Sequence, residues 1–204
     1  SELQRRGVKV LVSVFDLLEA YTYQHESPQA NECELPQTKK WLGDHPELLH
    51  VSRKQGRIEY LCPWKRLGDC TYYEDFYVEK LAAVLRDYGF DGYHGCDGFA
   101  HQRIPIYDGD FSDDMVGQFL DATGVQLPPG VGLQCGDNLK DIAARADWIW
   151  RNRRREWIGF HVQRIESFWR KAAKALHAEG KQLILNSAWT RDPFEAIYRY
   201  GVDY

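Results

Sequence analysis

The stretch YGFDGYHGCDGFAH, from Tyr88 to His101, decides the fold that we expect for this chain. Gly89 stands where the end of a helix needs a residue with positive φ. The apolar run after it is too short for an independent helix and predicts a β-strand over about 91–96. Asp91 begins this strand and Asp97 follows it, so about 20 Å of extended chain separates the two carboxylates.

The same pattern of helix end, glycine and short apolar run recurs along the chain. It appears in LQRRGVKVLVSVF (Leu3–Phe15) and LHAEGKQLILNSAW (Leu176–Trp189), and YRYGVDY (Tyr198–Tyr204) begins it again. Strands that follow helices in this way, with apolar residues on both faces, indicate parallel βα units. The sequence therefore predicts three full strands and the start of a fourth.

The helices and the connections fit this interpretation. The apolar spacing predicts a helix over 72–88 and helical structure over most of 138–178, with a bend near Gly159, and Asp192-Pro193 begins a further short helix. Each helix-to-strand connection is essentially one glycine, whereas the strand-to-helix connections are long, at about 16–71 and 98–137. In a (β/α) barrel, long loops after the strands build the functional site.

We therefore expect an α/β fold, and specifically a TIM (β/α)8 barrel. A barrel has eight strands and typically ~250 residues, so the barrel would be incomplete in this chain. An open parallel α/β sheet is the alternative. No dinucleotide or P-loop fingerprint follows any strand, which favours the barrel. We treat residues 1–204 as a segment of a single domain.

Composition limits the classes of partner. The chain has 204 residues and a net charge of -4, which gives no general attraction to nucleic acid or to an anionic membrane. No apolar stretch reaches the ~18 residues of a membrane span. The basic run Arg151–Arg155 is interpreted as an exposed helix face. Five cysteines without a CxxC pair indicate mostly free thiols with at most two bridges. No signal peptide is visible. The sequence is compatible with a secreted or a cytoplasmic protein, and it leaves the oligomeric state open.

Asp97 is the candidate for chemistry, because a carboxylate at the C-terminal end of a barrel strand is typical of a catalytic or ligand-binding group. The glycines Gly92, Gly95 and Gly98 leave room for close approach by a ligand or by backbone. The alternative is a loop aspartate that caps a turn at Gly98. Asp91, at the opposite end of the strand, is predicted to form hydrogen bonds with nearby backbone groups and to have a structural role.

Other polar and aromatic residues follow the predicted strands or lie in the long loops. Aromatic rings beside carboxylates, amides and cations are typical of a carbohydrate-binding cleft, where the C–H face of a sugar packs on rings. No cofactor and no metal is expected. The predicted substrate-binding residues are Asp16, Tyr21, Trp64, Lys65, Arg66, His94, His101, Arg103, Asn186 and Trp189.

Two other chemistries remain open at the same strand. His94, Cys96, Asp97 and His101 are potential metal ligands, although Cys96 and Asp97 point to opposite sides of a regular strand. A metal-dependent hydrolase is thus the second alternative. A Cys96–His94 dyad is the other, on what we expect to be the more buried face, where His94 is also interpretable as a packed histidine. No GxSxG motif is present.

The stretch YGFDGYHGCDGF resembles the strand-four segment of retaining (β/α)8 glycoside hydrolases, which reads roughly G-[FV]-D-G-[IWY]-[HQ]-x-D. It is most similar to the family 66-like enzymes and to the family 10-like group of glycoside-hydrolase-like barrels. The segments Tyr60–Gly89 and Arg164–Trp189 are similar to the flanking regions of these barrels. The Asn-Glu pair that ends strand four in the large β-retaining clan is replaced by Cys96-Asp97, which counts against families 5 and 42.

The resemblance implies a glycosidase that acts on an oligo- or polysaccharide, with Asp97 as the nucleophile. Its acid/base would follow strand five or six, about 5 Å from the nucleophile. No carboxylate follows strand five before Asp192, so we expect the acid/base beyond Tyr204, with Asp192, Asp110 and Asp113 as weaker candidates. A non-catalytic carbohydrate-binding barrel is the alternative function.

Overall fold

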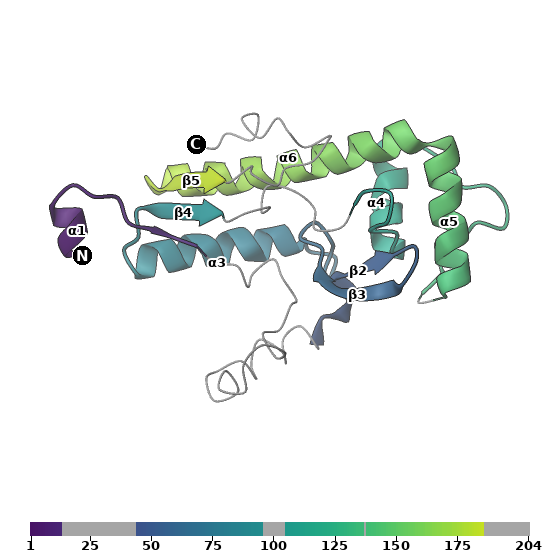
Figure 1. Ribbon diagram of the computed structural model, residues 1–204, viewed down its shortest axis with the longest axis horizontal. Helices are drawn as coiled ribbons and strands as arrows, with labels where there is room; N and C mark the ends of the chain where they lie inside the picture. The colour runs from purple at the N-terminus through teal and green to yellow at the C-terminus, as the bar shows by residue number, and fades with distance from the viewer. Residues whose placement is uncertain (14–43, 96–104, 137, 186–204) are drawn as a thin grey trace. The chain divides into compact units, whose positions relative to one another are not determined.

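The computed structural model describes residues 1–13, 44–95, 105–136 and 138–185. The chain divides into two compact units, and Figure 1 labels the elements of both. The first unit contains Ser1–Phe15, Glu74–Arg103 and Ile158–Tyr204, and the second contains Asp16–Tyr73 and Ile104–Trp157. Each unit is discontinuous in sequence, and the second unit corresponds largely to the two long connections that follow predicted strands. The expectation of a single domain over 1–204 stays a prediction.

The first unit contains a three-stranded parallel sheet. Its strands are β1 (Leu11–Val12), β4 (Gly92–Gly95) and β5 (Gln182–Leu185), in the order β1-β4-β5. β4 is thus the middle strand. Spatial order equals chain order, as expected when each helix returns the chain to the neighbouring strand position. The predicted α/β class with parallel strands is confirmed.

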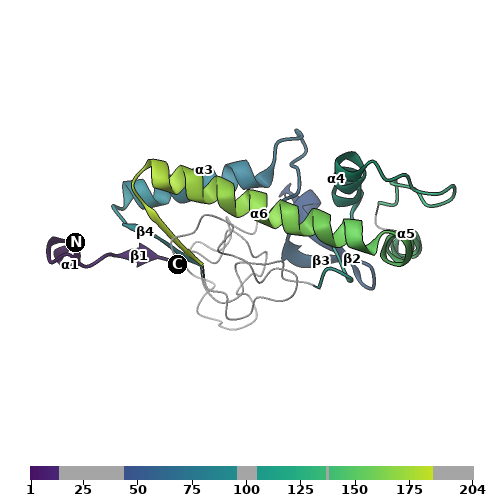
Figure 2. The ribbon, with the colours of Figure 1, turned by 90° about the horizontal axis from the view of Figure 1, so that it is seen from above.

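The helices α3 (Tyr73–Asp87) and α6 (Arg154–Ala178) directly precede β4 and β5 along the chain. Figure 2 shows both helices on the same face of β4 and β5. The predicted glycine caps are confirmed: Gly89 has a φ of +68° and Gly180 a φ of +67°. After α3, the Phe90 amide donates to the Leu85 carbonyl at 2.9 Å, which satisfies a carbonyl at the helix end. Gly7 ends the short helix α1 (Glu2–Arg5) with the same positive φ.

The core of the first unit lies between these helices and the sheet. Its fully buried side chains come from one face of α3, one face of α6 and the middle of β4 and β5, and the Tyr77 and Phe168 ring centroids are 5.4 Å apart. Burying such apolar side chains contributes ~1.5–3 kcal/mol each. The main members are Tyr77, Leu81, Leu85, Tyr93, Phe168, Ala172, Leu176 and Leu183.

The predicted helical region 138–178 consists of two helices; the helix does not break at Gly159, and the bend predicted near it stays a prediction. α5 (Leu139–Asn152) ends at Arg153, whose φ is -137°, and α6 then runs unbroken through Gly159. A glycine inside a helix costs only ~1 kcal/mol relative to alanine, which packing can offset. The break lies instead after Asn152, whose side-chain amide donates to the Trp148 carbonyl at 2.8 Å and so bonds at the helix end.

The second unit contains structure that the sequence pattern left as long loops. β2 (Leu49–Ser52) and β3 (Gly56–Leu61) pair as an antiparallel hairpin, preceded by the 3-10 helix η3 (Pro46–Leu48). A further helix, α4 (Asp113–Thr123), begins at Ser112, whose hydroxyl accepts from the Met115 amide. It ends at Gly124, which has a φ of +68°. Both caps follow ordinary helix-capping rules.

A buried arginine and three aromatic rings hold the second unit together. The Phe111 ring stacks on Trp157 with centroids 4.9 Å apart, and Phe119 packs on Trp157 edge to face at 5.0 Å. Arg145 on α5 is 0% exposed; it donates to Asp113 Oδ1 at 2.7 Å and to the Phe111 and Leu133 carbonyls. Several acceptors at the two terminal nitrogens thus compensate the burial of the guanidinium charge. In the described part of the chain, no helix is both long and apolar enough to cross a membrane.

Candidate functional site

The candidate active site follows the carboxyl ends of β4 and β5. Gly95 and Leu185 are paired in the last register position of these neighbouring strands. Along the chain, Asp97 comes two residues after Gly95, and Asn186 comes directly after Leu185. Most of the predicted site lies outside the described residues: Asp16, Tyr21, Asp97, His101, Arg103, Asn186 and Trp189.

Asp91, at the other end of β4, has the structural role that the sequence predicted. Its Oδ2 accepts from the Val10 amide at 2.8 Å and from Gln4 Nε2 at 3.0 Å, and Lys9 Nζ lies 3.8 Å from Oδ1. The hydrogen bond from the Val10 amide, followed by that from Gln4, lowers the pKa of Asp91 below its usual value. Asp91 thus ties the start of β4 to the segment that enters β1.

The two faces of β4 differ from the expectation. Tyr93 is 0% exposed, and its hydroxyl interacts with that of Tyr77 on α3, whose pKa is raised by burial and by Tyr93. His94 is only half-buried and alternates with Tyr93 along the strand. The expectation that His94 lies on the more buried face is therefore wrong. Cys96, its partner in the alternative dyad, lies outside the described residues.

Gly92 is a position of close backbone approach. A Cβ at Gly92 would lie 2.9 Å from both the carbonyl carbon and the amide nitrogen of Gln182, and would meet the Gln182 carbonyl oxygen. Any side chain here would force apart the paired strands β4 and β5. The glycine expected to mark close approach by ligand or backbone thus accommodates backbone.

The second unit contains the predicted residues Trp64, Lys65 and Arg66. Trp64 and Lys65 are each 2% exposed and lie in the interior. Arg66 is half-buried; its Nε donates to Asp114 Oδ1 at 2.5 Å, and its amide donates to Asp114 Oδ2 at 2.9 Å. The arginine therefore bonds to the first turn of α4. Whether these three residues bind substrate stays a prediction.

Two of the weaker acid/base candidates also have protein partners in this unit. Asp113 accepts from Arg145 at 2.7 Å and from the Cys135 amide at 3.2 Å. Asp110 Oδ1 accepts from the Ser112 amide at 2.8 Å and the Val51 amide at 3.1 Å, while Lys65 Nζ lies 3.3 Å from Oδ2. Burial raises the pKa of Asp110, but Lys65, His50 and these amides together lower it below its usual value. Asp110 is therefore held ionised.

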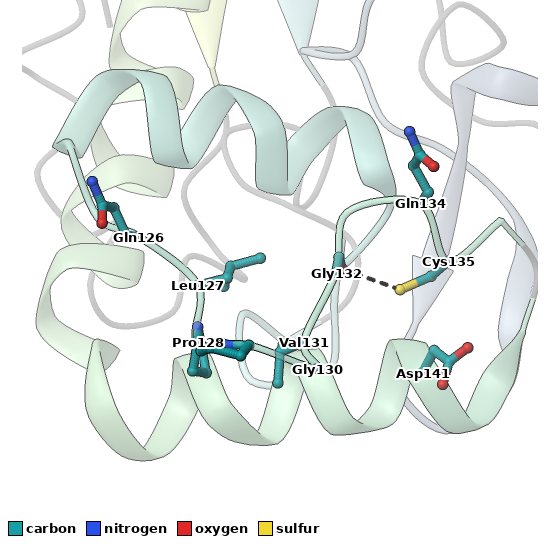
Figure 3. A pocket seen from close by; sticks show the side chains of 10 residues that line it. Gln126, Leu127, Pro128, Gly130, Val131, Gly132, Gln134, Cys135 and Asp141 are labelled. Carbon is teal, nitrogen blue, oxygen red and sulfur yellow. Dashed lines mark hydrogen bonds between the residues drawn. The ribbon is translucent and has the colours of Figure 1, made fainter.

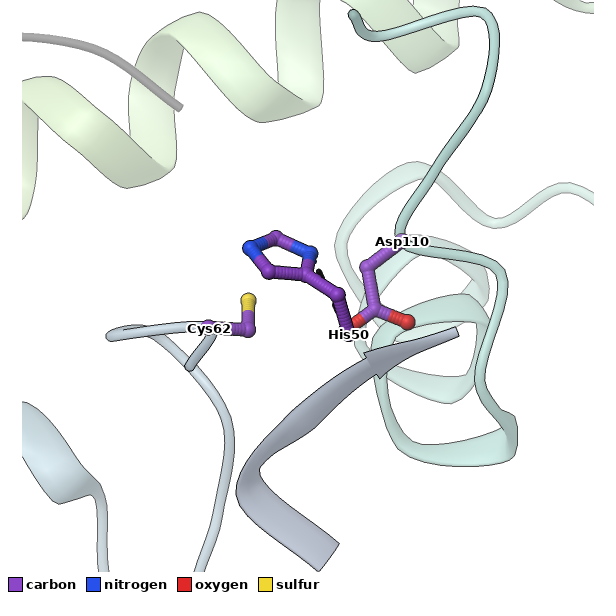
Figure 4. Close-up of side chains that lie close together, drawn as sticks. All are labelled: His50, Cys62 and Asp110. Carbon is purple, nitrogen blue, oxygen red and sulfur yellow. Dashed lines mark ion pairs between the residues drawn. The ribbon is translucent and has the colours of Figure 1, made fainter. Parts of the chain in front are cut away.

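Asp110 belongs to a buried group with His50 and Cys62 that the sequence pattern did not single out (Figure 4). One potential ligand atom of each side chain lies within 4.8 Å of the others, and His50 Nδ1 is 3.6 Å from Asp110 Oδ2. Burial, with a contribution from Lys65 and against the effect of Asp110, lowers the pKa of His50 to about 4. The imidazole is therefore neutral at neutral pH. No motif could reveal this group, because the hairpin and a distant loop bring it together.

A surface depression of about 710 Å³ lies in the second unit between α4 and α5 (Figure 3). Its lining comes from the connection 126–135 and from Asp141 on α5. Cys135 Sγ donates to the Gly132 carbonyl at 3.3 Å, and burial raises the pKa of this thiol. The depression offers a single carboxylate, whereas glycoside hydrolysis uses two. We therefore place no reaction there.

Comparison of this chain with protein-family models, with curated proteins and with solved structures found no significant match. The functional assignment therefore rests on the residues and the geometry of the chain itself.

Proposed function

We propose that this chain belongs to a retaining glycoside hydrolase in which Asp97 is the nucleophile and the sheet of the first unit is part of a (β/α)8 barrel. The observation that carries the proposal is the position of β4. It is the middle strand of a parallel sheet whose order follows the chain, and Asp97 comes two residues after its last residue. In (β/α) folds, side chains that follow strand ends build the active site.

Neighbouring positions support the proposal. The carboxyl ends of adjacent parallel strands meet at one edge of a sheet, about 4.8 Å apart. Asn186 follows the strand next to β4 and is suited to hydrogen-bond a sugar hydroxyl near the group that Asp97 attacks. Short connections that contain a glycine follow α3 and α6 at the opposite edge of the sheet. The long connections of the chain follow the strands instead.

The reaction would proceed in two steps. The Asp97 carboxylate attacks the anomeric carbon while the glycosidic C–O bond breaks, and a second carboxyl group protonates the leaving oxygen. Water then attacks the glycosyl–Asp97 ester, giving a proton to the second carboxylate and restoring Asp97.

Substitution of Asp97 tests the assignment. In the full-length protein, Asp97→Asn is expected to lower kcat on a panel of aryl glycosides and polysaccharides by at least about 1,000-fold, while sugar binding measured by calorimetry persists. Asp91→Asn is the matched control, because it alters a carboxylate at the other end of the same strand and should leave kcat unchanged. Equal turnover by Asp97→Asn and wild type would refute the nucleophile.

Two further outcomes separate the alternatives. Wild-type protein that binds oligosaccharides but hydrolyses none of the panel would support a non-catalytic carbohydrate-binding barrel. Turnover that disappears with a chelator and returns with added metal would support a metal-dependent hydrolase. The proposed mechanism predicts turnover that a chelator leaves intact.

A further inference from the structure

We propose that His50, Cys62 and Asp110 in the second unit form a binding site for a borderline-soft divalent transition metal of the Zn²⁺ class. This proposal does not depend on the proposed nucleophile, since all three residues belong to the second unit.

The hairpin brings two of the ligands together. Leu49 on β2 pairs with Leu61 on β3, and the Cys62 amide donates to the Leu48 carbonyl at 2.8 Å. The register shifts between Leu49 and Val51, so His50 lies at an irregularity of the hairpin, and its ligand atom lies within 4.8 Å of that of Cys62. The third ligand, Asp110, comes from the segment before α4, and the Val51 amide donates to its Oδ1 at 3.1 Å.

Two buried polar atoms in this group lack hydrogen-bond partners. His50 is 1% exposed and Asp110 is 0% exposed, yet neither His50 Nδ1 nor Asp110 Oδ2 forms a hydrogen bond, although Asp110 Oδ2 is ion-paired with Lys65 Nζ at 3.3 Å. The two atoms lie 3.6 Å apart, whereas Asp110 Oδ1 has two amide donors. Buried polar atoms are rarely left in this state, and an ion or a water is a common explanation. Figure 4 shows the His50 ring between Cys62 and Asp110.

The donor set selects the class of metal. A thiolate, an imidazole and a carboxylate are ligands of Zn²⁺ and of Co²⁺ that replaces it, whereas Mg²⁺ and Ca²⁺ prefer oxygen ligands alone. Bonds of ~2.0–2.3 Å place neighbouring ligand atoms of a tetrahedral site ~3.3–3.8 Å apart. The 3.6 Å distance from His50 Nδ1 to Asp110 Oδ2 already falls in this range, and the atoms of the group within 4.8 Å need only a small contraction.

The Lys65 ammonium competes with a metal ion for the Asp110 carboxylate. This ammonium lies 3.3 Å from Asp110 Oδ2 and donates to the Leu49 carbonyl at 2.5 Å, so it already supplies a positive charge beside the carboxylate. Metal binding must release the Cys62 proton and move the Lys65 ammonium away. Affinity should therefore rise with pH, and it should rise when Lys65 loses its charge.

Titration of the full chain with Co²⁺ tests the site. The expected result is one equivalent of bound Co²⁺ with a thiolate-to-cobalt charge-transfer band in the near ultraviolet, which Zn²⁺ abolishes by displacement. Cys62→Ala should remove the band and weaken binding at least about 100-fold. Cys135→Ala, at another buried cysteine of the same unit, should retain both. Lys65→Met should tighten binding.

Other outcomes overturn the proposal. A wild-type chain that gives no such band at a tenfold excess of Co²⁺ has no thiolate-containing metal site, and this result needs no folded variant. A band that survives in Cys62→Ala, with native circular dichroism, places the metal elsewhere. Either result would leave the Lys65–Asp110 pair beside a neutral His50 as a purely structural network.

Discussion

Glu74 at the start of α3 offers a sharp test of how the helices of the first unit are joined. Its side chain is 3% exposed and faces two cations of α6. Arg164 Nη2 lies 2.9 Å from Oε2, and Lys171 Nζ lies 2.5 Å from Oε1. Glu74→Gln keeps the size of the side chain but removes the charge that both cations share.

The magnitude follows from the burial of the three groups. Removing one partner of a buried ion pair costs ~3–5 kcal/mol, because the remaining charge is left without compensation. Here Arg164 is 16% exposed and Lys171 is 37% exposed and also bonds to Asp75, so solvent and Asp75 compensate part of the loss. We therefore expect the free energy of unfolding to fall by ~2–3 kcal/mol.

Urea unfolding followed by circular dichroism measures this difference. The matched control is Glu79→Gln on the same helix, whose side chain is 74% exposed and should change stability by less than ~0.5 kcal/mol. If Glu74→Gln is as stable as that control, the three groups do not form the buried ion-pair cluster described above, and the packing of α3 against α6 needs another explanation.

Further predictions concern the sheet and the same cluster. Gly92→Ala should lower the free energy of unfolding by ~1–3 kcal/mol, because its Cβ would meet the Gln182 backbone. Gly159→Ala has open space around its Cβ and should raise the free energy of unfolding by ~1 kcal/mol. Equal urea midpoints for the two variants would contradict both expectations. Burial opposes the shift, but hydrogen bonds to Asp75 and Glu74 raise the pKa of Lys171 above its usual 10.5. The stability that the charged Lys171 contributes through Glu74 and Asp75 is therefore fully present below pH 10.5 and is lost as pH rises through the raised pKa. Lys171→Met should accordingly flatten the alkaline part of a plot of unfolding free energy against pH.

The local rules of the sequence predicted the parallel sheet well. Glycines at helix ends are visible in sequence because a positive φ is costly for other residues, and Gly89 and Gly180 both adopt it. The Asp91 carboxylate also followed from its place at the start of a strand. The break after Asn152 could not be predicted as easily, because Gly159 is the more obvious breaker and only packing decides that it stays helical.

The structure of the long connections was predictable in part. Ser112, two acidic residues and Gly124 are an ordinary start and stop for α4, and this signal could have been found. The group of His50, Cys62 and Asp110 could not, since its members are far apart in sequence and meet only when the hairpin contacts the segment before α4. The burial of Trp64 and Lys65 likewise depends on tertiary packing, which a loop-like sequence does not reveal.

The central claim is that Asp97 forms a covalent bond to a sugar. The most direct measurement is to trap that bond in the full-length protein with a 2-deoxy-2-fluoroglycosyl fluoride, which slows the second step, and to map the modified peptide by mass spectrometry. The account predicts one glycosyl adduct, located on Asp97, with loss of activity at the same rate. An adduct on another carboxylate, or turnover by an enzyme that never forms an adduct, would contradict it.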